Sequence, residues 1–260
     1  MKPILPLAEV SRRYGLKHLQ GLPPPARDEQ NNMLRDPRGD FQFGSIKTNA
    51  IYRLASRWRH TEPALAMLAD QMRSAWLMHI AGTEQEQRLK QEVRDGVGWD
   101  DLSEAERDQK WIDTLVGVEA AKDQQRASQV MAASFGGSIV MVLDSLISTY
   151  REALDLKEVP HDERVGDLIG GRSLGAILWA AANNHRHVDD WAKELAPPSK
   201  GMMKSIAVLK DAVKWPETPR ITVNLGAYVV DKLMGSEGNF EAVNVRLFRY
   251  AQALADTVPD

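Results

Sequence analysis

Apolar residues recur along most of this chain at intervals of three and four positions, which is the spacing of one face of an α-helix. The first long segment of this kind has its apolar positions at Leu65, Leu68, Met72, Trp76 and Ile80. Thr61 followed by Pro63 favours a helix start, because threonine caps helices and proline is tolerated in the first turn. Gly82 predicts the end of this helix.

The same spacing predicts two further helices before residue 155. After a charged helical stretch at 84–93, Ser103 and Glu106 form a capping box that opens a long helix ending near Gly136-Gly137. The apolar positions of this helix are Trp111, Leu115, Val118, Ala121 and Val130. A second stripe, typical of a core rather than of a ligand pocket, consists of Ile139, Leu143, Leu146, Tyr150 and Leu154.

The C-terminal part predicts more helices: one that starts near Ser173, then 200–214, 223–234 and 240–255. The β-leaning triplet Ile221-Thr222-Val223 is too short to build a sheet. We therefore predict an all-α fold, a helical bundle with an irregular N-terminal arm. Residues 1–45 form the arm, with a short helix between Leu7 and Leu19, and residues 46–260 form the helical domain. No internal repeat is expected.

Composition adds limits on the class of protein. Hydrophobic residues make up 43% and charged residues 27% of 260 residues, as in ordinary globular proteins. The chain has no cysteine, which excludes disulfides and cysteine-based metal sites and fits a reducing cytosol. The N-terminal residues lack the apolar run of a signal peptide, and Asp144 interrupts the longest apolar run, so no window is expected to span a bilayer. We expect a cytoplasmic protein that contacts no membrane.

The net charge of −3 does not favour binding to nucleic acid through bulk electrostatics. A local basic cluster is present at Arg53, Arg57, Arg59 and His60. This cluster is either a solvated helix face or a phosphate-binding face.

One polar run stands out, Asn183-Asn184-His185-Arg186-His187-Val188-Asp189-Asp190-Trp191. In the helix that contains it, the core side is predicted to be formed by Leu174, Ile177, Leu178, Ala181, His185 and Val188. Asn183 and His187 are four residues apart and lie one above the other on a different side, with Arg186 at its border. The small residues 180–182 would permit close approach by another helix or by a second subunit.

The segment 181–191 resembles the Asn-x-x-x-His segment of some proteins of the HEPN superfamily. In these proteins small residues, Asn, a basic or aromatic stretch, His and an acidic pair ending in Trp lie on the signature helix. HEPN domains are helical bundles that commonly dimerise, and many are metal-independent ribonucleases of toxin–antitoxin, phage-defence and CRISPR systems. The resemblance implies a HEPN-like homodimer that acts on RNA without a cofactor, with two histidines brought into one cleft.

The usual HEPN motif is Arg, a polar residue that is often Asn, three variable residues and His. Asn183 matches the polar position and His187 the histidine, whereas the Arg position falls on Ala182. Arg186 is the nearest substitute, because Arg172 lies roughly 16 Å from Asn183 along the helix. In the implied mechanism His187 transfers a proton, Asn183 orients the imidazole or binds phosphate, and Arg186 contacts phosphate.

Alternatives of other classes exist for the same residues. Asn, His and acidic side chains also cap helices and bind neighbouring loops, which would fit a non-catalytic interaction module that binds a co-encoded partner protein. His185-x-His187-x-Asp189-Asp190 resembles the start of the metallo-β-lactamase signature. On a helix, however, residues two apart point about 200° from each other, so no metal site is expected. Gly171–Ser173 is a minor candidate for phosphate binding at a helix N-terminus.

Overall fold

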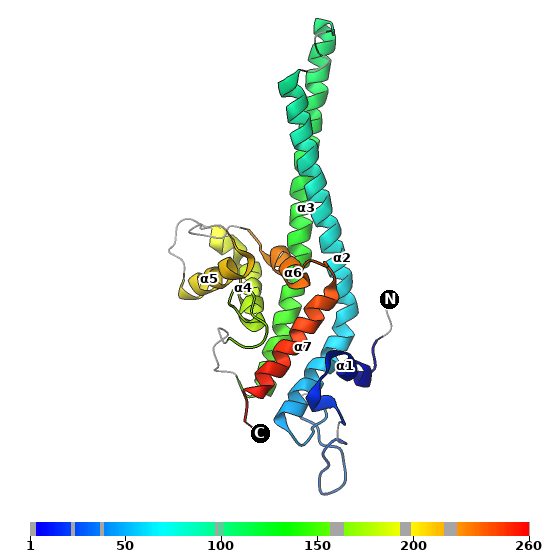
Figure 1. The fold of residues 1–260 in the computed structure, drawn as a ribbon, viewed down its shortest axis with the longest axis vertical. Helices are drawn as coiled ribbons and strands as arrows, with labels where there is room; N and C mark the ends of the chain where they lie inside the picture. Colours follow the sequence, from blue (N-terminus) through cyan, green and yellow to red (C-terminus); the bar gives the residue numbers. More distant parts are fainter. Residues whose placement is uncertain are drawn as a thin grey trace. The chain divides into compact units, whose positions relative to one another are not determined.

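The structure, a computed structural model, describes residues 4–21, 24–36, 39–96, 99, 101–156, 164–192, 199–215 and 223–259. Its helices are α1 (Leu7–Tyr14), α2 (Ile46–Asp95), α3 (Glu104–Ala153), α4 (Leu174–Ala192), α5 (Lys200–Val213), α6 (Gly226–Met234) and α7 (Phe240–Asp256), with the 3-10 helix η1 (Lys17–Leu19) after α1 (Figure 1). The described residues form isolated β-bridges but no strand. This confirms the predicted all-α fold class.

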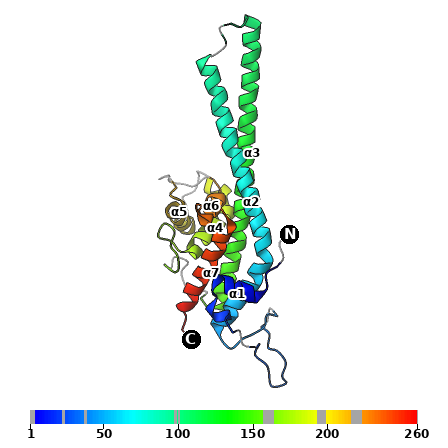
Figure 2. The same ribbon diagram turned by 45° about the vertical axis from the view of Figure 1, so that its right-hand side comes forward.

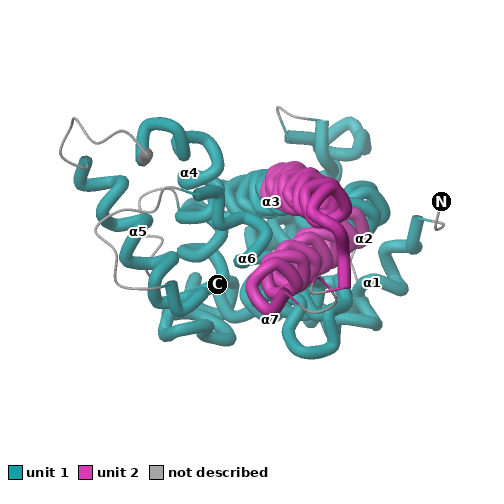
Figure 3. The backbone as a smooth tube through the Cα atoms, turned by 90° about the horizontal axis from the view of Figure 1, so that it is seen from above, with its two compact units in different colours: residues 1–69, 136–260 teal, residues 70–135 magenta. Residues whose placement is uncertain are grey.

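The chain divides into two compact units, coloured separately in Figure 3. Unit 1 comprises residues 1–69 and 136–260, and unit 2 comprises residues 70–135. Helices α2 and α3 each contribute to both units, because the boundaries fall within them. Every residue of the polar run 183–191 belongs to unit 1.

Helix α2 is a single helix of 50 residues, so the predicted helix start at Thr61 is wrong. Pro63 lies inside the helix. The Thr61 hydroxyl donates to the carbonyl oxygens of Arg57 (3.3 Å) and Trp58 (3.0 Å) in the preceding turn, rather than capping a new helix. Threonine inside a helix uses its hydroxyl in this way, and therefore the Thr-Glu-Pro sequence alone does not mark a helix start.

The glycines that were predicted to end helices also lie inside them. Helix α2 continues past Gly82 to Asp95, and α3 runs without interruption through Gly136-Gly137. A Cβ on Gly82 would lie 3.2 Å from the carbonyl oxygen of Ala121 on α3. A Cβ on Gly136 would overlap the backbone of Ala227 at the start of α6. These glycines thus allow close contact between helices instead of ending them.

The last part of α3 forms the centre of the unit 1 core, as its spacing predicts. The buried residues of this stripe are Ile139, Leu143, Leu146, Tyr150 and Leu154. Helix α7 packs nearby and receives a hydrogen bond from α2, where Trp58 Nε1 donates to Asn244 Oδ1 (3.1 Å). Figure 2 shows α1 near α7, and there the Tyr14 ring stacks on Phe248 with centroids 4.6 Å apart.

Unit 2 is a pair of antiparallel helical segments, and it buries less apolar surface than predicted. Val118 and Ala121 are buried as expected. The predicted core positions that are exposed instead are Ile80, Trp111, Leu115 and Val130. One half of the predicted capping box is present, because Glu106 Oε2 accepts from the Ser103 backbone N–H, while the Ser103 hydroxyl also donates to this oxygen.

The N-terminal arm contains an eight-residue structural repeat that was not expected from the sequence. The described residues of the two stretches 26–33 and 34–41 (without 37–38) each turn back after an Arg-Asp pair, at Arg27-Asp28 and Arg35-Asp36. In each turn the arginine donates to the carbonyl oxygen four residues later, at 2.6 Å and 2.7 Å respectively. The backbone N–H of residue 34 donates to the carbonyl of 26, that of 42 to 34, and that of 26 to 42, which closes a ring.

One expectation about membranes needs correction. Helix α3 contains an 18-residue window that is long and apolar enough to cross a bilayer by length and composition. Half of this window is buried inside the structure, where Ile139 and Leu143 form part of the core. Core helices of soluble proteins pass the same test, so the window is weak evidence for a membrane span.

Candidate functional site

The polar run lies in the last half of α4, a helix that is held firmly by the rest of unit 1. Ser173 begins it, with its hydroxyl oxygen accepting from the backbone N–H of Ala176 (3.2 Å). Residues 180–182 are fully buried within the chain itself. Ala182, at the Arg position of the HEPN motif, therefore leaves no room for a long side chain, and the Arg position cannot contribute a surface charge here.

The neighbouring residues Asn183 and Asn184 bind different partners. Asn183 Nδ2 donates to the Ser205 hydroxyl on α5 at 2.9 Å. Asn184 is fully buried, and its side chain donates to the Val223 carbonyl (3.2 Å) and accepts from the Leu225 backbone N–H (2.8 Å). Asn184 thus holds the segment that leads into α6. The spacing of residues within α4 gives no sign of this role, because the partners of Asn184 lie about forty residues away in the chain.

The side chain of His185, on α4, lies against α3 and the segment before α6. Asn224 Oδ1 accepts from the Gly226 backbone N–H (2.8 Å), so its Nδ2 donates to His185 Nδ1. This contact requires a neutral imidazole with its proton on Nε2. Burial, and to a smaller degree the positive charge of Arg186, lower the pKa of His185 below its ordinary value. The ring also lies against Gly137, where any Cβ would overlap it.

The lowered pKa of His185 predicts a loss of stability in acid. The unfolded chain binds a proton at the ordinary histidine pKa of 6.5, whereas the folded chain does so only at lower pH. The contribution is complete above pH 6.5 and is lost as the pH falls toward the folded-state pKa. Urea unfolding of the wild type and of His185→Gln at several pH values between 5 and 8 measures it. The variant should show a weaker decrease in unfolding free energy, and equal decreases would contradict this role of His185.

Arg186 and His187 face outward from the same stretch of α4. Arg186 forms an ion pair with Asp144 of α3 (3.2 Å) while 43% of its side chain stays exposed. His187 is 51% exposed, with Nδ1 3.6 Å from Asp190 Oδ2. The backbone of His187 is not helical (φ −127°, ψ 18°), so α4 bends at this residue. The structure thus gives Asn183 and His187 different partners, Ser205 for one and Asp190 for the other.

Other candidates from the sequence also have clear positions. Arg172 pairs with Asp211 on α5 (2.7 Å), away from the polar run. Ser173 serves as a helix cap through its bond with the Ala176 N–H. Among the described residues, no group of three or more His, Asp or Glu side chains is arranged to hold a metal ion.

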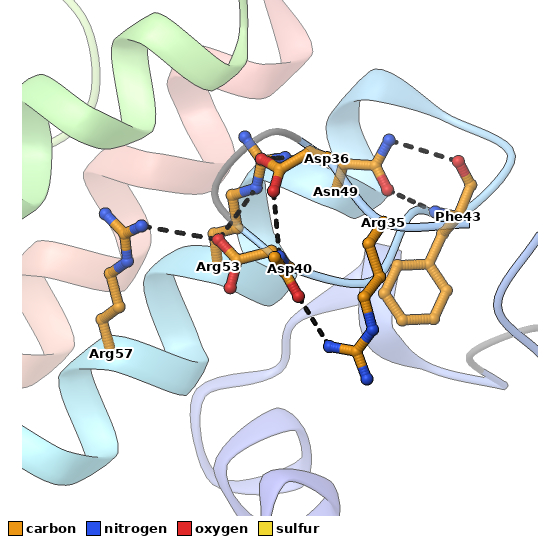
Figure 4. Close-up of polar contacts among 8 residues, drawn as sticks. Arg35, Asp36, Asp40, Phe43, Asn49, Arg53 and Arg57 are labelled. Carbon is orange, nitrogen blue, oxygen red and sulfur yellow. Dashed lines mark hydrogen bonds and ion pairs between the residues drawn. The ribbon is translucent and has the colours of Figure 1, made fainter. Parts of the chain in front are cut away.

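Two members of the basic cluster of α2, Arg53 and Arg57, pair with carboxylates of the N-terminal arm (Figure 4). The Arg53 guanidinium pairs with Asp36 and lies 3.5 Å from Asp40 Oδ2. Arg57 lies 3.4 Å from the same oxygen of Asp40. Both carboxylates come from the second eight-residue repeat, so this repeat is anchored on α2. The Arg53 side chain is only 14% exposed, so this residue belongs neither to a solvated face nor to a phosphate-binding face.

A groove of about 620 Å³ lies beside this cluster in unit 1. It is lined by Ser56, Arg57, His60 and Thr61 from α2 and by Met141, Val142, Ser145 and Leu146 from α3. Its lining is mostly apolar and includes two basic side chains of α2, Arg57 and His60.

Comparison of the chain with protein-family models, with curated proteins and with solved structures finds no match. The exposed side chains of the polar run include Arg186, His187 and Asp190, and Arg186 pairs with the buried carboxylate of Asp144.

Proposed function

We propose that the surface around His187 cleaves RNA without a metal ion, in a phage-defence or toxin-like setting. The observation that carries the proposal is the exposed imidazole of His187 at the bend of α4, with a carboxylate 3.6 Å from its Nδ1. With Asp190 near Nδ1, the Nε2 atom can accept a proton. The resemblance to HEPN proteins agrees with this choice, and adds RNA and a second copy of the chain as expected partners.

The proposed reaction uses the nucleophile that RNA itself carries. His187 Nε2 removes the proton of a 2′-hydroxyl, the 2′-oxygen attacks the adjacent phosphorus, and the 5′-oxygen leaves with a proton from water or from the imidazolium. The products are a 2′,3′-cyclic phosphate and a 5′-hydroxyl. The exposed part of Arg186 binds a phosphate oxygen, while Asp144 fixes the direction of its guanidinium. Asn183 positions α4 through Ser205 rather than touching the imidazole.

RNA cleavage in the presence of EDTA tests this proposal. The full chain is incubated with labelled single-stranded RNA, and the ends of the products are identified. His187→Ala should reduce the cleavage rate by about 10²-fold or more, which is the usual contribution of a general base. Because His187 is half exposed, circular dichroism and the melting temperature should change little. His60→Ala is the matched control, since His60 is an exposed histidine of α2.

Three results would reject the proposal: no cleavage of any RNA, full activity of His187→Ala, or equal cleavage of RNA that carries 2′-deoxyribose at the cut position. A second candidate, a non-catalytic interaction module, is favoured by the internal pairing of Arg186 and Asn183. It predicts that the chain binds a co-encoded protein stably and that no RNA is cut.

A further inference from the structure

Exposed apolar side chains are concentrated in unit 2. Of the sixteen large apolar residues that are exposed among the described residues, nine lie within 70–135, which is a quarter of the chain. Exposed apolar side chains that lie close together typically mark a protein interface. None of these residues belongs to the α4 site, so a role for this surface is independent of the RNA-cleavage proposal.

The contact between the two helical segments of unit 2 buries few large apolar side chains and therefore stabilises them little. Its buried positions are mostly small, among them Ala75, Gly82, Ala121, Ser128 and Ala132. Helices in water owe most of their stability to the burial of an apolar face. A hairpin with alanine and glycine along its seam, and leucine, isoleucine and tryptophan outside it, is therefore incomplete as an isolated unit.

Three of the large exposed apolar residues of unit 2, Ile80, Trp111 and Leu115, lie on the same side of the hairpin. The register is set by Gln125, which donates to Thr83 (2.7 Å), and by Gly117, which lies against Leu89. On helices with about 100° per residue, Leu115 lies roughly a quarter turn from the seam and Ile80 roughly a third of a turn, whereas Leu77 and Ile112 point away from the seam. Because the segments are antiparallel, Leu115 and Ile80 lie on the same side. Met78 and Val116 point to the opposite side.

On this side the apolar residues form two groups at different heights. Ile80 is the first, near one end of the hairpin, and Leu115 with Trp111 is the second, toward the turn. Leu115 is level with about residue 90 of α2, so roughly 15 Å separates it from Ile80 along the helix axis. A two-fold axis midway between the groups would place each group of one copy on the other group of its partner.

We propose that this face binds the same face of a second copy of the chain, with the two hairpins antiparallel. Charge favours this orientation. Residues 83–120, nearest the turn, carry eleven acidic and five basic side chains, a net charge of −6. Residues 70–82 and 121–135 together carry three basic and two acidic side chains, a net charge of +1. Antiparallel pairing sets each −6 half against a +1 half, whereas parallel pairing would set the two −6 halves together.

The size of the face is sufficient for a stable homodimer. Residues 70–95 of α2 span about 39 Å, and two adjacent helices are about 20 Å wide. The resulting face of about 800 Å² matches the roughly 800 Å² that each partner contributes to a standard stable interface. Pairing of this isologous kind is closed, so the assembly ends at two chains.

Sedimentation of the full chain over a range of micromolar concentrations tests the proposal. The wild type should sediment as a dimer of 29.1 kDa chains. Ile80→Glu with Leu115→Glu should shift it to a monomer. Met78→Glu with Val116→Glu is the matched control and should remain dimeric, since Met78 is 41% and Ile80 40% exposed but on opposite sides. A monomeric wild type, or the same sedimentation for both variants, would overturn the proposal.

The absence of cysteine allows a direct test of orientation. Ile80→Cys with Leu115→Cys should form disulfide-linked dimers on mild oxidation, because the antiparallel arrangement sets residue 80 of one copy on residue 115 of the other. Within one chain these positions are too far apart for a disulfide, which needs Cα atoms no more than about 7 Å apart. Ile80→Cys alone should stay uncrosslinked. Efficient crosslinking of this single variant would show parallel pairing and reject the arrangement.

Discussion

Gly136→Val is expected to prevent the chain from folding into its native structure. A Cβ at this position would overlap the backbone of Gly226 and Ala227. Backbone atoms, unlike a side chain, cannot change rotamer to relieve the overlap. Overpacking against side chains typically costs ~1–3 kcal/mol of unfolding free energy. Because the overlap here is with backbone, the cost of this substitution should reach or exceed the upper end of that range. Such a loss is a large part of a typical unfolding free energy of about 5–15 kcal/mol.

Urea unfolding followed by circular dichroism measures this effect. Gly136→Ala should already lower the unfolding free energy clearly, because the first added carbon makes the overlap. Gly201→Ala in α5 is the matched control: a Cβ there has no atom within 4 Å, and the change should stabilise the chain by about 0.4–1 kcal/mol. If Gly136→Ala unfolds at the same urea concentration as the wild type, the close packing of α3 on α6 is not required for stability.

Asn184→Ala is expected to destabilise the protein far more than the same change at its neighbour. Asn184 is fully buried, and its loss leaves the Val223 carbonyl and the Leu225 N–H without their partner. Leaving a buried polar group unpaired costs about 1–3 kcal/mol, so two such groups cost roughly 2–6 kcal/mol. Asn183→Ala removes a single bond to Ser205, whose net value is about 0.5–1.5 kcal/mol.

Thermal and urea unfolding of the two variants compare them directly. The comparison also separates structure from catalysis, since the resemblance to HEPN proteins predicts a role in the reaction for Asn183 and not for Asn184. A destabilisation by Asn183→Ala equal to that by Asn184→Ala would contradict the role of Asn184 as the anchor of the segment before α6. Loss of RNA cleavage in Asn183→Ala with an unchanged melting temperature would show that Asn183 also acts in the reaction.

Helix content could be predicted well, because helical spacing is a local property. The stripe from Ile139 to Leu154 is buried as expected, and α7 begins with Asn239 accepting from the Ala242 N–H. The predictions that failed depended on Thr61, Gly82 and Gly136 as boundary signals. Glycine serves equally in a turn and in close helix contact, and the sequence around it does not say which use applies.

The candidate site was predicted only in part for the same reason. Its position on one helix followed from the run 183–191. The pairing of Arg186 with Asp144 and of His185 with Asn224 joins residues about forty positions apart, which no local pattern reveals. The bend at His187 changes the regular spacing on which the pairing of Asn183 with His187 was based.

Local spacing and residue type were thus enough to establish an all-α chain without disulfides and to select the polar helix, since both depend on neighbours within a few positions. The roles of the residues on that helix depended on packing. Asn184 and His185 became anchors and Arg186 became a paired cation because α3 and the segment before α6 lie against α4. His187 is left exposed at the bend, where the nearby carboxylate of Asp190 comes from its own helix.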